Sequence, residues 1–88
     1  MEFEWDERKA ASNLAKHDVS FDVAMAFDWA NAQVTPDRRA DYGEPRFIAY
    51  GRTSDGQGYV IAFTPRGNKT RIITIRRFGR KEIQTYGP

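Results

Sequence analysis

The sequence contains no cysteine, a single histidine and no long apolar run. Without cysteine the chain has neither disulfides nor thiolate metal ligands, which fits a reducing compartment. No apolar segment approaches the ~18 residues of a membrane-spanning helix. The acidic opening MEFEWDERK also lacks the apolar centre of a signal peptide. We therefore expect a soluble cytoplasmic protein with no membrane partner.

Several kinds of catalytic site are missing as well. One histidine and scattered acids give no recognisable metal-ligand spacing, so we expect neither a metal site nor a cofactor. The glycines of SDGQG and PRGN lie between predicted strands and match no phosphate-binding fingerprint. Serine triads would have only His17 as a base, and no nucleophile elbow is present.

The composition that remains indicates one folded domain, residues 1–88. The chain has 88 residues, of which 40% are hydrophobic and 14% aromatic. These fractions argue against disorder. So short a chain buries a modest share of its surface and is marginally stable.

Charge is divided unevenly along the chain. Residues 1–55 hold seven Lys or Arg and eleven Asp or Glu, whereas residues 56–88 hold seven Lys or Arg and one acid. The last third is therefore strongly basic although the net charge is only +2. Such polarity favours an anionic partner on one side of the fold.

Helical patterns occupy the first third. Asp6 is a predicted N-cap for a helix over ERKAASNLAKH, residues 7–17, and Asp18 follows at a position that often needs a left-handed backbone. Ser20 is a predicted cap for a second helix over residues 21–30, FDVAMAFDWA. Its wide apolar stripe indicates burial on more than one side.

Strand patterns dominate the rest. A short strand is expected at residues 3–5, a long polar loop at 35–45, and three strands at 46–53, 59–64 and 70–77, joined by the turns SDGQG and PRGNK. A short helix is expected over residues 80–86. The predicted class is α+β: two N-terminal helices on a small antiparallel sheet, with the order β-α-α-β-β-β, an optional further strand, and a final α-helix.

The basic residues near the end suit phosphate recognition, because guanidinium groups bind phosphate oxygens in bidentate fashion. In a regular strand Arg76 and Arg77 face opposite ways, but a bulge or strand end near Gly79 lets them converge. Arginine with an aromatic ring on a sheet is typical of single-stranded RNA platforms. Arg71 is expected to be structural, paired with an acid on a helix. Trp5 and Trp29 are expected in the core or in an interface and not as base-stacking groups.

The same residues resemble a known family. The segment FEWDERKAASNLAKHDVSF is similar to the opening of the BrnT toxins, with F-E-W-D followed by K, N and K-H-x-V-x-F at set intervals. GEPRFIAYG and TPRGNKTRIITIRRFGRKEIQTY resemble two further BrnT segments, so the likeness covers nearly the whole chain. Two departures are Asp18, in place of the usual glycine, and Phe78–Gly79, where a small residue and a hydroxyl cap are common.

The resemblance implies a RelE-like fold and a metal-independent endoribonuclease that arrests translation. It also implies a BrnA-like antitoxin that neutralises the toxin and itself contacts operator DNA. A dimer is expected within the toxin–antitoxin complex. The nucleophile is then the ribose 2′-hydroxyl of the RNA, and the protein must hold it in line and neutralise the developing charge. The expected catalytic residues are Arg76, Arg77, Arg66, Arg80 and Tyr86; further RNA contacts are Lys81, Arg71 and Lys69.

Proton transfer is assigned less directly, because arginine is a poor base near neutrality. The candidates are Tyr86, His17 and Glu44 in that order. Tyr86 comes first because surrounding Lys and Arg residues make a nearby phenol more acidic. A different class of function remains open: a non-catalytic module that binds nucleic acid or protein through the same basic surface. That alternative includes a degenerate toxin that acts only as a repression partner.

Overall fold

The computed structural model describes residues 1–88 and confirms the α+β class. The expected first strand, two helices, three hairpin strands and final helix are present, and the additional strand, β2, precedes the hairpin strands where the prediction placed it after them. They are β1 (Glu2–Glu4), α1 (Glu7–His17), α2 (Val23–Ala26), the 3₁₀ turn η1 (Trp29–Asn31), β2 (Gln33–Pro36), β3 (Phe47–Arg52), β4 (Gly58–Arg66), β5 (Lys69–Arg77) and α3 (Arg80–Tyr86). None of these helices is long and apolar enough to cross a membrane.

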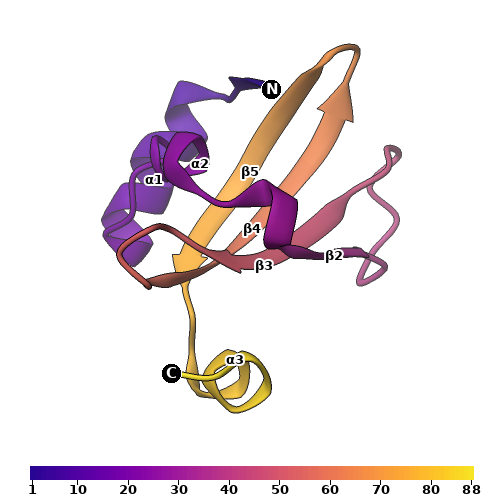
Figure 1. Ribbon diagram of the computed structural model, residues 1–88. Coiled ribbons are helices and arrows are strands. Elements are labelled where there is room, and N and C mark those ends of the chain that lie inside the picture. Colours follow the sequence, from indigo (N-terminus) through magenta and orange to yellow (C-terminus); the bar gives the residue numbers. More distant parts are fainter.

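The strands form one sheet in the order β1-β5-β4-β3-β2 (Figure 1). The expectation of a purely antiparallel sheet is wrong at one edge, because β1 pairs in parallel with β5. Parallel neighbours need a long crossover connection, and here almost the whole chain provides it. At the other edge β2 pairs with β3, so the polar loop begins after Pro36 and not at Thr35.

The first helix begins and ends where its caps predict. The Asp6 carboxylate accepts a hydrogen bond from the Arg8 amide at 2.8 Å, satisfying a free donor of the first turn. Asp18 takes the left-handed conformation, φ 56°, and its amide donates to the Leu14 carbonyl. The aspartate in place of glycine therefore keeps the helix end intact.

The second helix is shorter than predicted. Instead of residues 21–30, only Val23–Ala26 is α-helical, and Phe27 leaves it with extended backbone. The Asp28 amide donates to the Arg52 carbonyl at the end of β3. The Trp29 indole Nε1 donates to the Ala24 carbonyl at 2.8 Å. These longer-range bonds replace helical ones, and the chain turns into η1.

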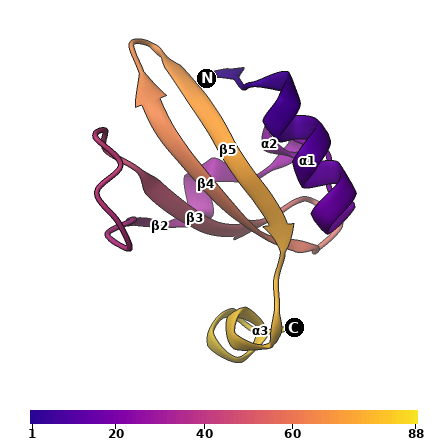
Figure 2. The ribbon, with the colours of Figure 1, turned by 180° about the vertical axis from the view of Figure 1, so that it is seen from behind.

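The core lies between the sheet and the segments that cover one of its faces. α2 and η1 lie over that face, in front in Figure 1 and behind in Figure 2, while α1 flanks β5. Ile61, Ile75 and Ala49 are fully buried there. Trp5 and Trp29 pack against this core, as predicted. The opposite face of β3, β4 and β5 carries no helix (Figure 2).

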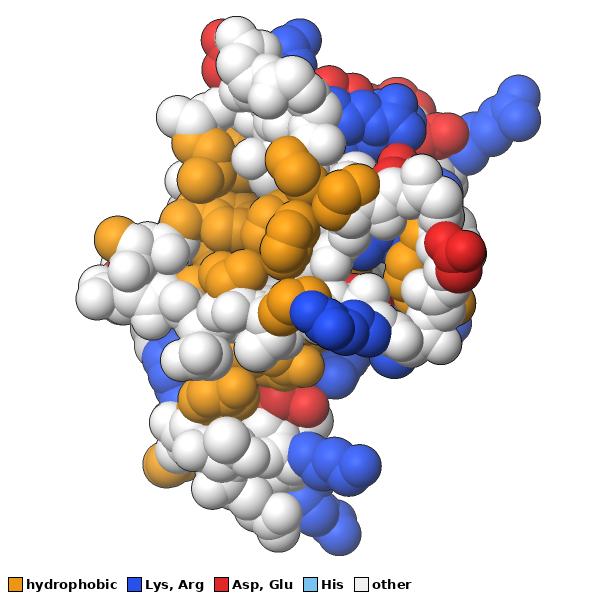
Figure 3. Space-filling model, turned by 90° about the vertical axis from the view of Figure 1, so that its right-hand side faces the viewer, with side chains coloured by type: hydrophobic (Ala, Val, Ile, Leu, Met, Phe, Trp, Pro, Cys, Tyr) orange, Lys and Arg blue, Asp and Glu red, His pale blue; other side chains and the backbone are white.

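The cover is thinnest toward β2. Phe63 stacks on Phe47 at 5.7 Å and meets Trp29 edge-on at 5.3 Å, yet all three rings stay partly exposed. Val34 on β2 is 42% exposed. This side of the molecule shows a broad group of hydrophobic side chains with Lys and Arg at its margins (Figure 3).

A bulge in β5 overturns the simple alternation of its side chains. Ala62 pairs with Thr74 but Phe63 pairs with Ile72, so Ile73 has no partner on β4. The extra residue brings Ile72 and Ile75 to the same covered face. Ile72, expected on the face of Arg76, is therefore a core residue, 1% exposed.

A buried side-chain amide closes the edge of β5 beyond the end of β1. Asn13 Nδ2 donates to the Ile75 carbonyl at 2.7 Å, and the Ile75 amide donates to Asn13 Oδ1 at 3.1 Å. Asn13 Nδ2 also donates to the Val19 carbonyl. The amide thus takes the role of the missing strand and joins α1, β5 and the segment after α1.

We expect Asn13→Ala to destabilise the fold by roughly 2–4 kcal/mol, because two buried backbone groups of Ile75 lose their partner. Urea unfolding followed by circular dichroism measures this free energy. Ser12→Ala on the exposed side of the same helix is the control and should change stability by less than about 0.5 kcal/mol. Equal effects of the two substitutions would contradict the assigned role.

Candidate functional site

The uncovered face of the sheet carries a depression of about 300 Å³ over β3, β4 and β5. Its floor is apolar and comes from two neighbouring strands: Ile48 of β3, and Val60 and Ala62 of β4. Its rim is polar and comes from four parts of the chain: His17 of α1, Arg39 of the 37–46 loop, Tyr50 of β3, and Thr74 and Arg76 of β5. The sheet therefore brings two guanidinium groups and the only imidazole to one hollow.

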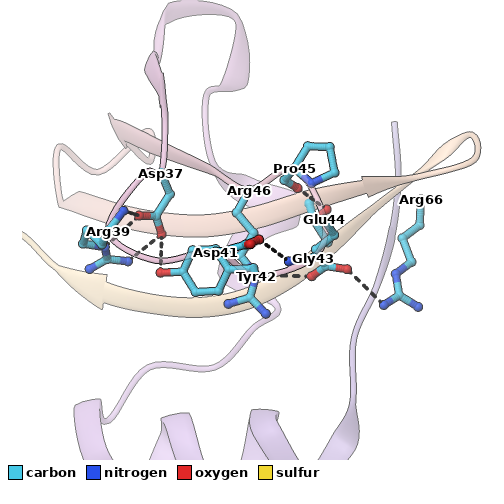
Figure 4. Close-up of polar contacts among 10 residues, drawn as sticks. Asp37, Arg39, Asp41, Tyr42, Gly43, Glu44, Pro45, Arg46 and Arg66 are labelled. Carbon is cyan, nitrogen blue, oxygen red and sulfur yellow. Dashed lines mark hydrogen bonds and ion pairs between the residues drawn. The ribbon is translucent and has the colours of Figure 1, made fainter.

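Arg39 owes its position to a buried carboxylate. Asp37, whose side chain is 1% exposed, accepts from Arg39 Nε at 2.8 Å and from Arg39 NH2 at 2.7 Å (Figure 4). The Arg39 amide and the Tyr42 hydroxyl donate to the same carboxylate. These bonds, led by that of Arg39, lower the pKa of Asp37 to about 2 and raise the pKa of Arg39. The loop is thus folded by a bidentate ion pair.

The second half of that loop is fixed by stacking and by a further ion pair. The Arg46 guanidinium lies 4.0 Å from the centre of the Tyr42 ring. Glu44 pairs with Arg46 at 3.2 Å and with Arg66 at 3.4 Å (Figure 4). Arg46, then Arg66, lower the pKa of Glu44. Glu44 does not line the depression and lies outside the site.

Arg76 is held from the other side by α3. Its NH1 donates to Glu82 Oε1 at 2.8 Å and its NH2 to Glu82 Oε2 at 3.3 Å. Glu82 also accepts from the Gly79 amide at 2.7 Å. Arg76 first, and then the Gly79 amide, lower the pKa of Glu82 to about 2. The carboxylate therefore stays charged and keeps Arg76 oriented along the rim.

Arg77 points elsewhere. Its NH1 donates to the His17 carbonyl and its NH2 to the Asp18 carbonyl, both at 3.2 Å. These are the free acceptors at the C-terminus of α1, where positive charge is favourable. Arg77 thus supports the backbone of His17, and its own guanidinium does not line the depression.

Other predicted residues lie at the far end of the β4–β5 hairpin. Arg66 pairs in register with Lys69 at the hairpin tip, whereas Arg76 pairs with Val60. At ~3.3 Å per residue these positions are roughly 20 Å apart. Arg71 pairs with Glu4 on β1 at 2.7 Å, a strand partner and not a helical one. One clamp that contains both Arg66 and Arg76 is therefore not formed.

The predicted site residues of the terminal helix α3 all lie outside the depression. Arg80 and Lys81 are exposed, and their side chains make no hydrogen bond or ion pair. Neither residue lines the depression. Tyr86 stacks on Tyr50 at 5.4 Å, outside the hollow. Burial, followed by Tyr50 and Glu82, raises the pKa of the Tyr86 phenol. The expected acidification of this phenol is wrong, because no free cation lies beside it.

Three residues of the rim were not selected from the sequence: Arg39, Tyr50 and Thr74. Arg39 carries a readable signal, since Asp37 two residues earlier matches the turn in which an aspartate accepts the amide at i+2. Tyr50 and Thr74 carry none, because their place depends on the register of three strands. No group of three or more His, Cys, Asp or Glu residues is arranged to hold a metal ion.

Comparisons with known proteins define the class of molecule to which this site belongs. Residues 5–82 match the family model described as ribonuclease toxin, BrnT, of type II toxin–antitoxin system. The crystal structure of the Brucella abortus ribonuclease toxin BrnT matches with a TM-score of 0.72 and 29% identity. That match covers 91% of this chain and 99% of the other. A search of curated proteins gives no match.

Fold and sequence therefore define a ribonuclease toxin of a type II toxin–antitoxin system, which implies an antitoxin partner. The chain belongs to the BrnT family. The resemblance seen in the sequence is confirmed, and the alternative of a non-catalytic binding module is not favoured.

The pairing of Glu82 with Arg76 predicts a dependence of stability on acid. A carboxyl whose pKa falls from 4.5 to about 2 on folding stabilises the folded state above pH 4.5. That contribution is lost as the pH falls toward 2. Urea unfolding of the wild type and of Glu82→Gln at pH 6, 4 and 2.5 measures it. At pH 6 the wild type should have a larger free energy of unfolding than Glu82→Gln, and this difference should shrink at pH 2.5. A difference that does not change with pH would contradict the pairing.

Proposed function

We propose that RNA is cleaved in the depression bounded by His17, Arg39 and Arg76, without a metal ion. The observation that carries this proposal is the convergence of two oriented guanidinium groups and one imidazole on a single hollow. Each guanidinium is fixed by its own carboxylate, Asp37 or Glu82, so the donors are arranged before substrate binds. Donors fixed in advance stabilise a transition state without reorganisation.

The chemistry follows from the substrate. The ribose 2′-hydroxyl attacks the neighbouring phosphorus in line with the departing 5′-oxygen, leaving a 2′,3′-cyclic phosphate and a 5′-hydroxyl. Negative charge grows on the non-bridging oxygens as the bond forms. Arg39 and Arg76 approach the hollow from opposite sides of the β3–β5 face and neutralise this charge. Loss of one such donor typically costs about 10²–10³ in rate.

Proton transfer falls to His17. It is the only histidine on the rim, and histidine is the side chain that proteins most often use as a general acid or base. Tyr86 lies outside the hollow with a raised phenol pKa, and Glu44 is engaged by two arginines. His17 is therefore proposed as the base that takes the proton from the 2′-hydroxyl, and the leaving 5′-oxygen takes up a proton from water. Arg77 is a positioning residue that holds the His17 backbone.

The surroundings of this reaction are proposed from the family. The protein acts in the cytoplasm, where RNA cleavage arrests translation. A BrnA-like antitoxin neutralises it and binds operator DNA, so the toxin reaches DNA only through the antitoxin. The toxin forms a dimer within the toxin–antitoxin complex. The arrangement of helices on a small sheet is consistent with the RelE-like relationship. Arg80, Lys81, Arg71, Lys69 and Arg66 are proposed as outer contacts to the RNA backbone.

Arg39→Ala should lower kcat/KM for RNA cleavage about 10²-fold, because it removes one of two charge-stabilising donors. Arg76→Ala should have a similar effect. Arg38→Ala is the matched control: this neighbour is exposed, forms no ion pair or hydrogen bond, and should leave the rate unchanged. Cleavage of a fluorescent oligoribonucleotide measures the three rates. Equal losses for Arg38→Ala and Arg39→Ala would show a general charge effect and remove Arg39 from the site.

Cleavage should persist in excess EDTA, since the proposed reaction uses only side chains and the substrate hydroxyl. The purified protein is incubated with RNA, and the products are resolved by mass, with a cyclic phosphate expected at the 3′ end. His17→Ala serves as the inactive control. Loss of cleavage in EDTA with recovery on adding magnesium would overturn the mechanism.

A further inference from the structure

A second and larger cavity, about 590 Å³, adjoins the depression between α3, the end of β3 and η1. Resting on the proposed function, we propose that this cavity binds an unpaired nucleobase next to the cleaved phosphate. It would then select which linkage the toxin cuts. The residues that support the proposal are Tyr50, Phe78, Tyr86, Asp28, Asn31 and Gln33.

Part of the wall is aromatic. Tyr86 stacks on Tyr50 with ring centres 5.4 Å apart and planes 27° apart, and Phe78 lies 5.7 Å from Tyr86. Phe78 is packed too closely against Gly58 for any Cβ there, so this ring is firmly placed. Flat rings of this kind stack on bases of any sequence. Phe78 thus supplies an aromatic surface to the cavity.

Another part of the lining is polar and keeps hydrogen-bonding atoms without a partner. The Gln33 side chain is exposed and has no hydrogen-bond partner, so its amide offers donors and an acceptor. Asn31 Nδ2 donates to Asp28 Oδ2 at 2.7 Å, which leaves Asn31 Oδ1 free. Amide groups of this kind read the edges of splayed bases by hydrogen bonds.

The charges in the cavity argue against a phosphate as its ligand. The one cation in the lining is Arg52, which donates to the carbonyls of Gly56, Tyr86 and Gly87 at 2.9, 3.1 and 2.8 Å. Its guanidinium also lies 5.2 Å from the centre of the Phe78 ring. Three of the five Arg52 N–H donors are thus used to hold the end of α3 and the β3–β4 turn, and Asp28 adds a negative charge. A neutral, flat, hydrogen-bonding ligand fits this wall.

The two cavities meet at one side chain. Tyr50 lines both the depression with Arg39 and Arg76 and the larger cavity. In RNA one ribose separates a phosphate from its base, so neighbouring hollows can hold both groups of a single nucleotide. This adjacency favours a base subsite over an unrelated small-molecule site.

The test uses oligodeoxynucleotides with a single ribonucleotide, and hence one cleavable linkage, made with each of the four bases. An abasic unit replaces the base on either side of that linkage. Loss of the base on one side should lower kcat/KM by tenfold to a hundredfold, on the order expected for a stacked base. Gln33→Ala should change the order of preference among the four bases. Gln84→Ala, an exposed glutamine of α3 outside the cavity, is the matched control and should not.

Binding of all-deoxy oligonucleotides, which cannot be cleaved, provides a second readout. A base on the sensitive side should strengthen binding in the wild type and less so in Tyr86→Leu. Equal rates and equal binding for base and abasic units on both sides would overturn the subsite. Failure of the cleavage site has a different signature: Arg39→Ala and Arg76→Ala would cleave at full rate while the dependence on base remained.

Discussion

The amide of Asn13 is the contact on which the arrangement of this protein depends. It pairs with both backbone groups of Ile75 and with the Val19 carbonyl, and so fixes α1 against a strand edge that β1 is too short to cover. His17 lies four residues later, on the same side of the helix. The bond that closes the sheet therefore also sets the imidazole beside the open face. Arg77 completes the attachment by binding the carbonyls at the end of α1.

Three arginines of the basic segment, residues 56–88, form ion pairs with acids, and two of these acids come from residues 1–55. Glu44 meets Arg66 and Glu4 meets Arg71, while Glu82 meets Arg76. Each pair removes some positive potential and in return fixes a direction for the guanidinium. In the mechanism proposed for the depression, the direction of the guanidinium groups matters more than their total charge, because the transition state is stabilised by donors already in place. The free charges of Arg80 and Lys81 remain at the periphery.

Local signals predicted local structure well. Asp6 and Asp18 predicted both ends of α1, and the glycine turns predicted the three main strands. What failed depends on contacts between distant segments: the break in α2 at Phe27, the bulge at Ile73, and the parallel pairing of β1 with β5. The candidate site likewise contains residues that the sequence predicts and features that depend on how the strands pair. Arg76 and His17 were selected from the sequence, but the distance of Arg66 and the inclusion of Tyr50 follow from register alone.

The parallel pairing of β1 with β5 also bears on how the molecule is made. The strand synthesised first can find its neighbour only after residues 69–71 have left the ribosome. Until then the emerging chain holds Phe3 and Trp5 without their final surroundings, and Ile75, to which Asn13 binds, has not yet emerged. A contact between such remote positions forms late and slows folding. A ribonuclease toxin therefore lacks this edge of its sheet until residues 69–71 have emerged.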